Sequence, residues 1–128
     1  MDIRIKTTDY ELAQEVRTYL DDKIASIEKL LGNEAGTARC EVELGRAAGR
    51  PRHGANMWFA EMRIVVPGED DIYARNNSST VNAAIDDVKE EAERQLRKGK
   101  KLHIRMIRRT GAAVKRWMRL VTPPEEGA

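Results

Sequence analysis

The stretch 79-STVNAAIDDVKEEAERQLRKGKKLHIRMIRR-109 decides the fold, because it carries a strong helical pattern. The hydroxyl of Ser79 or Thr80 is suited to accept a hydrogen bond from a free backbone N–H of a first helical turn. The apolar residues that follow recur at steps of three and four, and therefore share one helix face: Val81, Ala84, Ile85, Val88, Ala92 and Leu96. We predict an amphipathic helix whose apolar face packs on a core.

Charge divides the chain within this same stretch. Residues 1–93 hold 12 Lys and Arg against 19 Asp and Glu, a net charge of −7, whereas residues 94–128 hold 11 against 2, a net charge of +9. A few cations near a helix C-terminus are favoured by the helix dipole, but this basic run continues far beyond one turn. Such segregation is typical of a protein that binds a polyanion, and a solvated tail is the alternative.

The beginning of the chain predicts a short strand and then a long helix. Ile3 and Ile5 alternate with charged residues, as in a half-buried strand. A capping box of Thr8 and Glu11 is expected to begin the helix, with Asp9 as an equally good cap. The apolar residues of this helix share one face and run up to a Gly-Asn pair that ends it: Leu12, Val16, Tyr19, Leu20, Ile24, Ile27, Leu30 and Leu31.

Three more segments alternate as strands do, namely 37–44, 57–66 and 71–75. In each of them the core residues are expected to share one face: Ala38, Cys40, Val42, Leu44, Trp58, Ala60, Met62, Ile64, Val66, Ile72 and Ala74. Residues 45–56 are rich in Gly and Pro and predict a loop, and residues 76–78 are expected to lead into the second helix.

The resulting order β-α-β-β-β-α predicts an α+β fold, with two helices packed on one face of a four-stranded sheet. The first two strands are expected to be parallel neighbours. The other sheet face is polar enough to stay in contact with water: Arg4, Lys6, Glu41, Glu43, Glu61, Arg63, Tyr73 and Arg75. We expect this domain to cover residues 1–101 and a basic C-terminal extension to cover residues 102–128.

The composition favours a cytoplasmic protein. Cys40 is the single cysteine, so an intramolecular disulfide is impossible, which is consistent with a reducing compartment. The first residues lack the apolar segment of a secretory signal, and no apolar run reaches the ~18 residues that a membrane span needs. We therefore expect a soluble protein of the cytoplasm.

The sequence contains no recognisable catalytic or metal-binding constellation. It has neither a phosphate-binding glycine loop nor a paired-cysteine zinc motif. His53 and His103 lack acidic partners at a useful spacing, and the adjacent Asp86 and Asp87 diverge by about 100° around a helix. We expect a protein that is not an enzyme and that needs no metal, cofactor or small-molecule substrate.

The element order and the second helix resemble the ribosome hibernation-promoting factor family, whose members are also called ribosome-associated inhibitors or sigma-54 modulation proteins. The residues that carry the resemblance are Ala83-Ala84-Ile85-Asp86, Arg94-Gln95-Leu96 and the basic continuation, together with a first helix that ends at Leu-Leu-Gly. The resemblance covers about residues 1–101. Thr80 and Asn82 depart from it, because the family usually has an acidic and an aromatic residue there.

The resemblance implies translation inhibition by occupancy. Members of this family bind the small ribosomal subunit near the messenger RNA channel and the A and P sites, where basic residues on their helices contact ribosomal RNA. Lys23 on the first helix is one candidate for such a contact, with a helix-surface ion pair as the alternative. The second helix and its continuation supply the other RNA-binding candidates: Arg94, Arg97, Lys98, Lys100, Lys101, Arg105, Arg108 and Arg109.

Two other functions are compatible with the sequence. A general double-stranded RNA-binding or ribosome-assembly module would bind isolated duplex RNA. A membrane-surface protein would use the basic amphipathic pattern of residues 112–121. The resemblance favours a stress-response regulator that binds 16S-type ribosomal RNA of the small subunit, involves no membrane, and is a monomer away from the ribosome.

Overall fold

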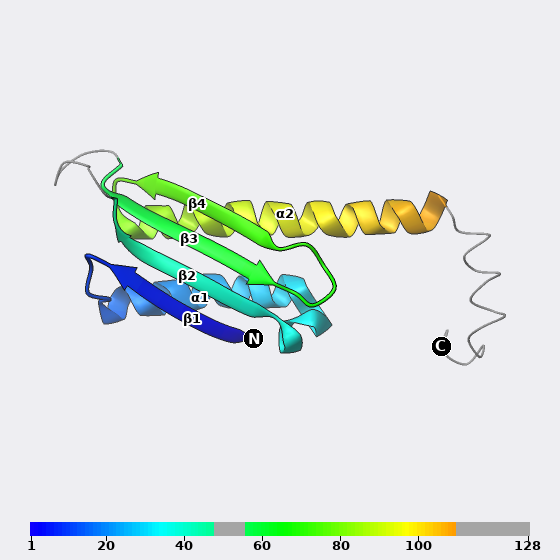
Figure 1. Ribbon diagram of the computed structural model, residues 1–128, viewed down its shortest axis with the longest axis horizontal. Helices are drawn as coiled ribbons and strands as arrows, with labels where there is room; N and C mark the ends of the chain where they lie inside the picture. The colour runs from blue at the N-terminus through cyan, green and yellow to red at the C-terminus, as the bar shows by residue number, and fades with distance from the viewer. Residues whose placement is uncertain (48–55, 110–128) are drawn as a thin grey trace. The chain divides into compact units, whose positions relative to one another are not determined.

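The computed structural model describes residues 1–47 and 56–109, with side chains described as far as residue 100. The chain divides into two compact units, Met1–Leu96 and Arg97–Ala128. The described elements have the predicted order β-α-β-β-β-α, with one additional 3₁₀ helix (Figure 1): β1 (Asp2–Thr8), α1 (Gln14–Leu31), η1 (Gly32–Thr37), β2 (Arg39–Arg46), β3 (Trp58–Val65), β4 (Ile72–Ser78) and α2 (Val81–Arg109).

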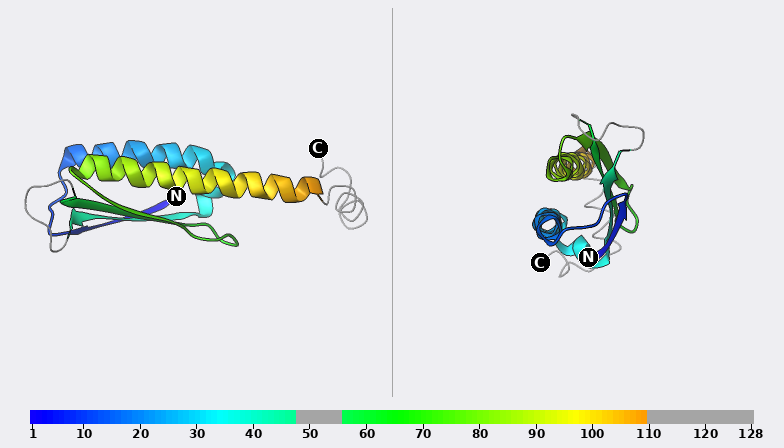
Figure 2. Two further views of the ribbon diagram at one scale, coloured as in Figure 1. Left: turned by 90° about the horizontal axis from the view of Figure 1, so that it is seen from above. Right: turned by 90° about the vertical axis from the view of Figure 1, so that its left-hand side faces the viewer.

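The four strands form one sheet in the order β1-β2-β3-β4. β1 and β2 are parallel, as predicted, and the other two pairs are antiparallel. Two adjacent parallel strands need a crossover connection, and α1 provides it. Both helices lie on the same face of the sheet, as the view from above in Figure 2 shows.

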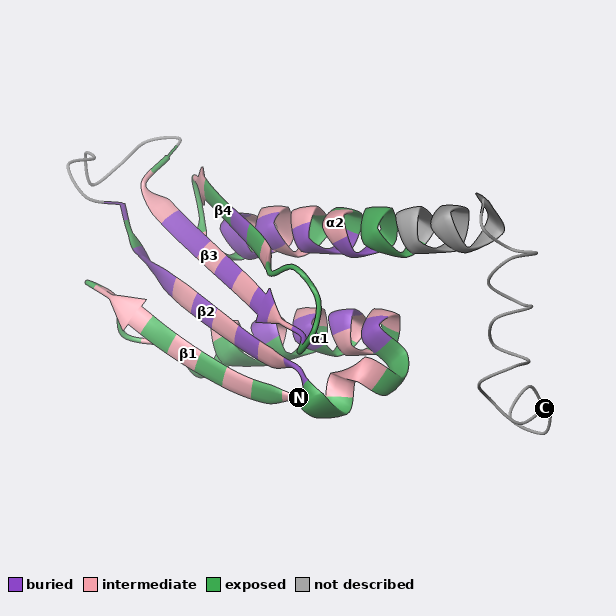
Figure 3. Ribbon diagram, turned by 45° about the vertical axis from the view of Figure 1, so that its right-hand side comes forward, coloured by how far each residue is buried: buried purple, intermediate pink, exposed green. Residues whose placement is uncertain are grey.

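The core lies between this sheet face and the two helices. Leu20, Ile24 and Ile27 of α1 are at most 1% exposed, and Ile85 and Val88 of α2 are equally buried. Buried and less buried residues alternate along β2 and β3 in Figure 3, because successive side chains of a strand point to opposite faces. The predicted apolar faces of both helices and of the inner strands are thus confirmed.

Cys40 is a core residue of β2. Its side chain is fully buried, and burial, together with the nearby charges of Glu28 and Glu41, raises the pKa of the thiol to about 12. Because the thiolate is the reactive form, this environment makes the cysteine chemically inert.

The predicted capping box at the start of the first helix is wrong. β1 continues to Thr8, which pairs with Gly45 of β2 and donates its hydroxyl hydrogen to the Glu43 carboxylate at 2.6 Å. Asp9, the alternative cap, lies in the turn after the strand with a φ of 50°. α1 begins only at Gln14 and has no side-chain cap. The parallel ladder therefore overrides the local capping signal.

Two strands also extend further than predicted. β2 ends at Arg46 rather than Leu44, and β4 includes Asn76-Asn77-Ser78, which pair with the first three residues of β3. A Cβ atom at position 45 would overlap the backbone oxygen of Thr8, so Gly45 permits the close approach of β1 and β2. The second helix begins as predicted, since Ala83 N–H donates to Thr80 Oγ1 at 3.0 Å.

The outer sheet face is polar, as predicted, and its arginines Arg4, Arg63 and Arg75 each have an acidic partner. Arg75 lies 3.0 Å from Glu61, and its guanidinium also stacks 4.3 Å from the centre of the Phe59 ring. This stacking covers Phe59, which is only 4% exposed although it points away from the helices. In the described part of the chain, no helix is long and apolar enough to cross a membrane.

Candidate nucleic-acid interface

Lys23 is placed on α1 by the helical register, but it faces an acid. Its Nζ atom lies 3.5 Å from Asp86 Oδ1 and 4.8 Å from the centre of the Tyr19 ring. Tyr19 donates its hydroxyl hydrogen to the same Asp86 oxygen at 2.6 Å, and this hydrogen bond is the main reason for the raised pKa of Tyr19. The arrangement is a compact bridge between α1 and α2, in which the ammonium group already has an anionic partner.

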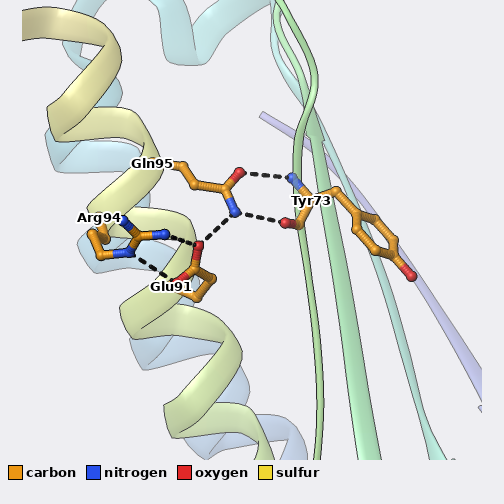
Figure 4. A network of polar contacts seen from close by, with 4 residues as sticks. All are labelled: Tyr73, Glu91, Arg94 and Gln95. Carbon is orange, nitrogen blue, oxygen red and sulfur yellow. Dashed lines mark hydrogen bonds and ion pairs between the residues drawn. The ribbon is translucent and has the colours of Figure 1, made fainter.

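Arg94 is exposed near the middle of α2 and also has an anionic partner. Its guanidinium makes a two-point contact with Glu91, with Nε–Oε1 at 2.9 Å and Nη2–Oε2 at 2.7 Å (Figure 4). Hydrogen bonds from Arg94 and then from Gln95 lower the pKa of Glu91 to about 2. The carboxylate therefore stays charged at neutral pH and competes with any phosphate for Arg94.

Gln95 extends this network to the sheet. Its Nε2 atom donates to Tyr73 O at 2.7 Å and to Glu91 Oε2 at 2.8 Å, and Tyr73 N–H donates to Gln95 Oε1 at 3.2 Å (Figure 4). The sequence predicted neither contact of the carboxamide with the sheet. Only the contacts within the helix, Glu91 with Arg94 at i,i+3 and Glu91 with Gln95 at i,i+4, could have been read from the spacing.

A groove of about 530 Å³ separates β4 from α2 in the first unit. It is lined by three acidic residues, two arginines and three uncharged residues: Ala74, Arg75, Asn76, Asp87, Val88, Glu90, Glu91 and Arg94. Asn76 Nδ2 donates to Asp87 Oδ2 at 2.9 Å. Because acids outnumber bases in its lining, this groove does not favour a polyanion.

The predicted cations after Leu96 have a different setting. Arg97 and Lys98 are exposed, and no ion pair or hydrogen bond joins their side chains to the described residues. Lys100 is exposed as well. The acids that neutralise Lys23 and Arg94 thus have no counterpart at Arg97 and Lys98 within the described region.

The backbone of α2 continues through the remaining basic positions. The helix continues to Arg109, eight residues beyond the expected end of the domain at residue 101. Positions 97, 101, 105 and 108 follow one another at steps of four, four and three, which assigns them to one face of the helix. One face of the helix therefore carries four basic positions, Arg97, Lys101, Arg105 and Arg108. Arg109 does not follow this spacing. The pattern predicted for residues 112–121 lies outside the described residues.

Among the described residues, no group of His, Cys, Asp or Glu has an arrangement that could hold a metal ion.

Lys23 and Arg94 are not neighbours in the structure. Lys23 contacts Asp86, which lies eight positions before Arg94 on α2, or about 12 Å along the helix axis.

The match to a family model assigns the chain to a class of ribosome-associated proteins. Residues 3–103 match the family model described as "Sigma 54 modulation protein / S30EA ribosomal protein", so the chain belongs to that family. This is the family that the residues of the second helix resembled. No curated protein sequence matches.

Two solved structures share the fold at low sequence identity. The N-terminal domain of Protein Y from Thermus thermophilus is 21% identical, with a TM-score of 0.61, over 77% of this chain and 98% of that domain. A ribosomal subunit interface protein from Coxiella burnetii is 15% identical, with a TM-score of 0.62, over 79% of this chain and 99% of that protein. At these identities the likeness confirms the fold.

Proposed function

We propose that this protein is a ribosome hibernation factor that binds the small ribosomal subunit and blocks translation by occupancy. Its place would be near the messenger RNA channel and the A and P sites, where it would exclude messenger and transfer RNA without any chemical step. Family membership supports the association with ribosomes. The observation that carries the proposal is the exposed, unneutralised state of Arg97 and Lys98 within the described region, at the start of a basic helical face.

Phosphate contacts would supply most of the affinity. Each cation that neutralises a phosphate releases condensed counterions, so binding weakens steeply as salt rises. Arg97 and Lys98 would contribute first, because no acid in the described region has to be displaced from them. Lys23 and Arg94 would contribute less, since each has to exchange a carboxylate for a phosphate.

The first unit would provide selectivity rather than attraction. Its excess of acids repels nucleic acid, so productive binding requires an orientation that brings the basic positions of α2 to the RNA. Contacts to phosphates carry little sequence information, and shape would therefore decide which RNA is bound. In this proposal the protein acts in the cytoplasm and is a monomer when it is not on a ribosome.

Co-sedimentation with purified small subunits, large subunits and whole ribosomes over a salt series tests this proposal. The double variant Arg97→Glu/Lys98→Glu should lower the slope of log affinity against log salt by about 2, one unit for each lost phosphate contact. Lys6→Glu/Lys29→Glu is the matched control, because both lysines are exposed on the first unit and the change in charge is the same. Wild-type affinity in the Arg97/Lys98 variant would contradict the assigned surface.

Duplex RNA distinguishes the remaining alternative. A hibernation factor should bind small subunits far more tightly than an isolated 16S-type duplex, and it should stop messenger-directed translation at stoichiometric amounts. Equal affinity for the free duplex would instead identify a general double-stranded RNA-binding or assembly module. Absence of binding to any ribosomal particle at moderate salt would overturn both functions.

A further inference from the structure

β4 is an edge strand. It is the last strand in the order β1-β2-β3-β4, and within the described part of the chain it pairs only with β3. A free edge offers backbone N–H and C=O groups to any strand that approaches, which makes it a site of self-association. The outward-facing groups of β4 can be traced one by one, because its register with β3 is continuous from Ile72 to Ser78.

The residues of β4 whose backbone N–H and C=O groups point away from β3 are Tyr73, Arg75 and Asn77. Both backbone groups of Tyr73 bond to Gln95 instead of β3, so they point away from β3. Because the direction of the backbone groups alternates along an antiparallel strand, those of Arg75 and Asn77 point the same way. The N–H of Asn77 is occupied, because it donates to Asn76 Oδ1 at 2.9 Å. Among the described residues, no hydrogen bond occupies the backbone groups of Arg75.

Gln95 replaces a neighbouring strand at Tyr73. A carboxamide offers one acceptor and a donor group, as a backbone peptide does, and here it makes both bonds of a strand pair, at 3.2 and 2.7 Å. Its second hydrogen-bond donor is held by Glu91 at 2.8 Å, and Glu91 is held by Arg94 at two points (Figure 4). The carboxamide is therefore fixed in place, since three hydrogen bonds restrain it.

We propose that Gln95 blocks this edge, because its bonds to Tyr73 keep β4 from pairing with the β4 strand of a second copy of this chain. The edge is self-complementary. In an antiparallel pair centred on Ala74, Tyr73 would lie opposite Arg75 of the second copy, and the small Ala74 side chains would face each other. The same combination already exists across β3 and β4, where the Arg63 guanidinium lies 4.9 Å from the centre of the Tyr73 ring.

Gln95→Ala in the full chain tests whether Gln95 prevents this pairing. The variant loses both bonds to Tyr73, and we expect dimers in sedimentation-velocity experiments at protein concentrations where the unchanged protein is a monomer. Self-association should become at least about tenfold tighter, since two backbone groups per copy become available for strand pairing. Gln14→Ala is the matched control, because Gln14 is an exposed helical glutamine that bonds only within α1, to Thr18. It should stay monomeric.

A second substitution locates the interface. Adding Arg75→Pro to Gln95→Ala should restore the monomer, because proline removes the N–H that points away from β3 and leaves the backbone ladder with β3 intact. The substitution also removes the side-chain contacts of Arg75 with Glu61 and Phe59, so Arg75→Ala added to Gln95→Ala, which removes the same contacts and keeps the N–H, is its control. Dimers that persist in the proline variant would overturn the proposal, and so would a folded Gln95→Ala protein that stays monomeric at every concentration. If Gln95→Ala fails to fold, Gln95→Glu is the decisive variant. It keeps an acceptor for Tyr73 N–H but offers no donor to Tyr73 O. A weak dimer of Gln95→Glu would support the proposal, and a monomer would overturn it.

Discussion

Lys23, Arg75 and Arg94 in the first unit differ from Arg97 and Lys98 in their neighbours, although the sequence shows Arg94 and Arg97 in one basic run. In the first unit, Lys23 lies beside Asp86, Arg94 beside Glu91 and Arg75 beside Glu61. Arg97 and Lys98 have no such partner among the described residues. The difference teaches that the charge available to a polyanion depends on local acids, and that a count of Lys and Arg overstates it.

Reversing the cations after Leu96 should have the largest effect on binding. We expect Arg97→Glu/Lys98→Glu/Lys100→Glu/Lys101→Glu to weaken binding to small subunits by about 10³-fold or more at moderate salt, because the four phosphate contacts that we propose for these residues would be replaced by repulsion. Filter binding and co-sedimentation would measure the loss, and the urea midpoint would show that the domain stays folded. Tight binding by a folded variant would remove the distinction between the two sets of cations.

Truncating a side chain should lower the free energy of unfolding strongly on the buried face of α2 and hardly at all on its exposed face. Ile85→Ala is expected to cost about 2–5 kcal/mol of unfolding free energy, because Ile85 is fully buried and its loss leaves a cavity. Lys98→Ala should change that free energy by no more than about 0.5 kcal/mol, since its side chain is exposed. Denaturant titrations measure both, and a comparable cost at the two positions would contradict the division of the helix into a structural and a binding part.

Releasing a paired cation should strengthen binding slightly. Glu91→Gln removes the charged partner of Arg94 and leaves a side chain that can still bond to Gln95. Because an exposed ion pair is worth up to about 1 kcal/mol, the affinity for small subunits should rise by at most about fivefold. Isothermal titration at low salt can resolve this change. An unchanged or weaker affinity would show that Glu91 does not compete for Arg94.

The same carboxylate should leave a small signature in acid. The pKa of Glu91 is lowered from 4.5 to about 2 in the folded protein, so its pair stabilises the fold above the ordinary pKa and loses this effect as the pH falls through about 2. Unchanged protein and Glu91→Gln should therefore differ in denaturation midpoint at about pH 6 and converge near pH 2. A difference that is constant over this range would exclude the ionised carboxylate as its source.

The fold was predictable because its signals are local and periodic. Steps of three and four placed Ile85 and Val88 on a buried helix face, alternation placed Met62 inside, and a hydroxyl at residue 80 capped α2. The failure at Thr8 arose because its partner in β2 is distant in sequence and prevails over a local cap.

The basic stretch proposed as the binding site is visible in the sequence, whereas most of the contacts around its cations are not. The residues that neutralise cations include Asp86, which lies 63 positions from Lys23, and sequence spacing gives no indication of that contact. The bond of Gln95 to Tyr73 spans 22 positions and likewise depends on how α2 packs on the sheet. Where the partner is only three positions away, as for Glu91 and Arg94, the sequence already contained the information.

The parallel pairing of β1 and β2 has a consequence for the order in which the protein can fold. Every pair in that ladder joins residues 37 positions apart, with the whole of α1 between them. β1 is synthesised first, yet it has no strand partner until β2 exists and the crossover has closed. Such long-range pairing slows folding relative to a helical bundle. Formation of the sheet, rather than of its helices, is therefore expected to set the folding rate.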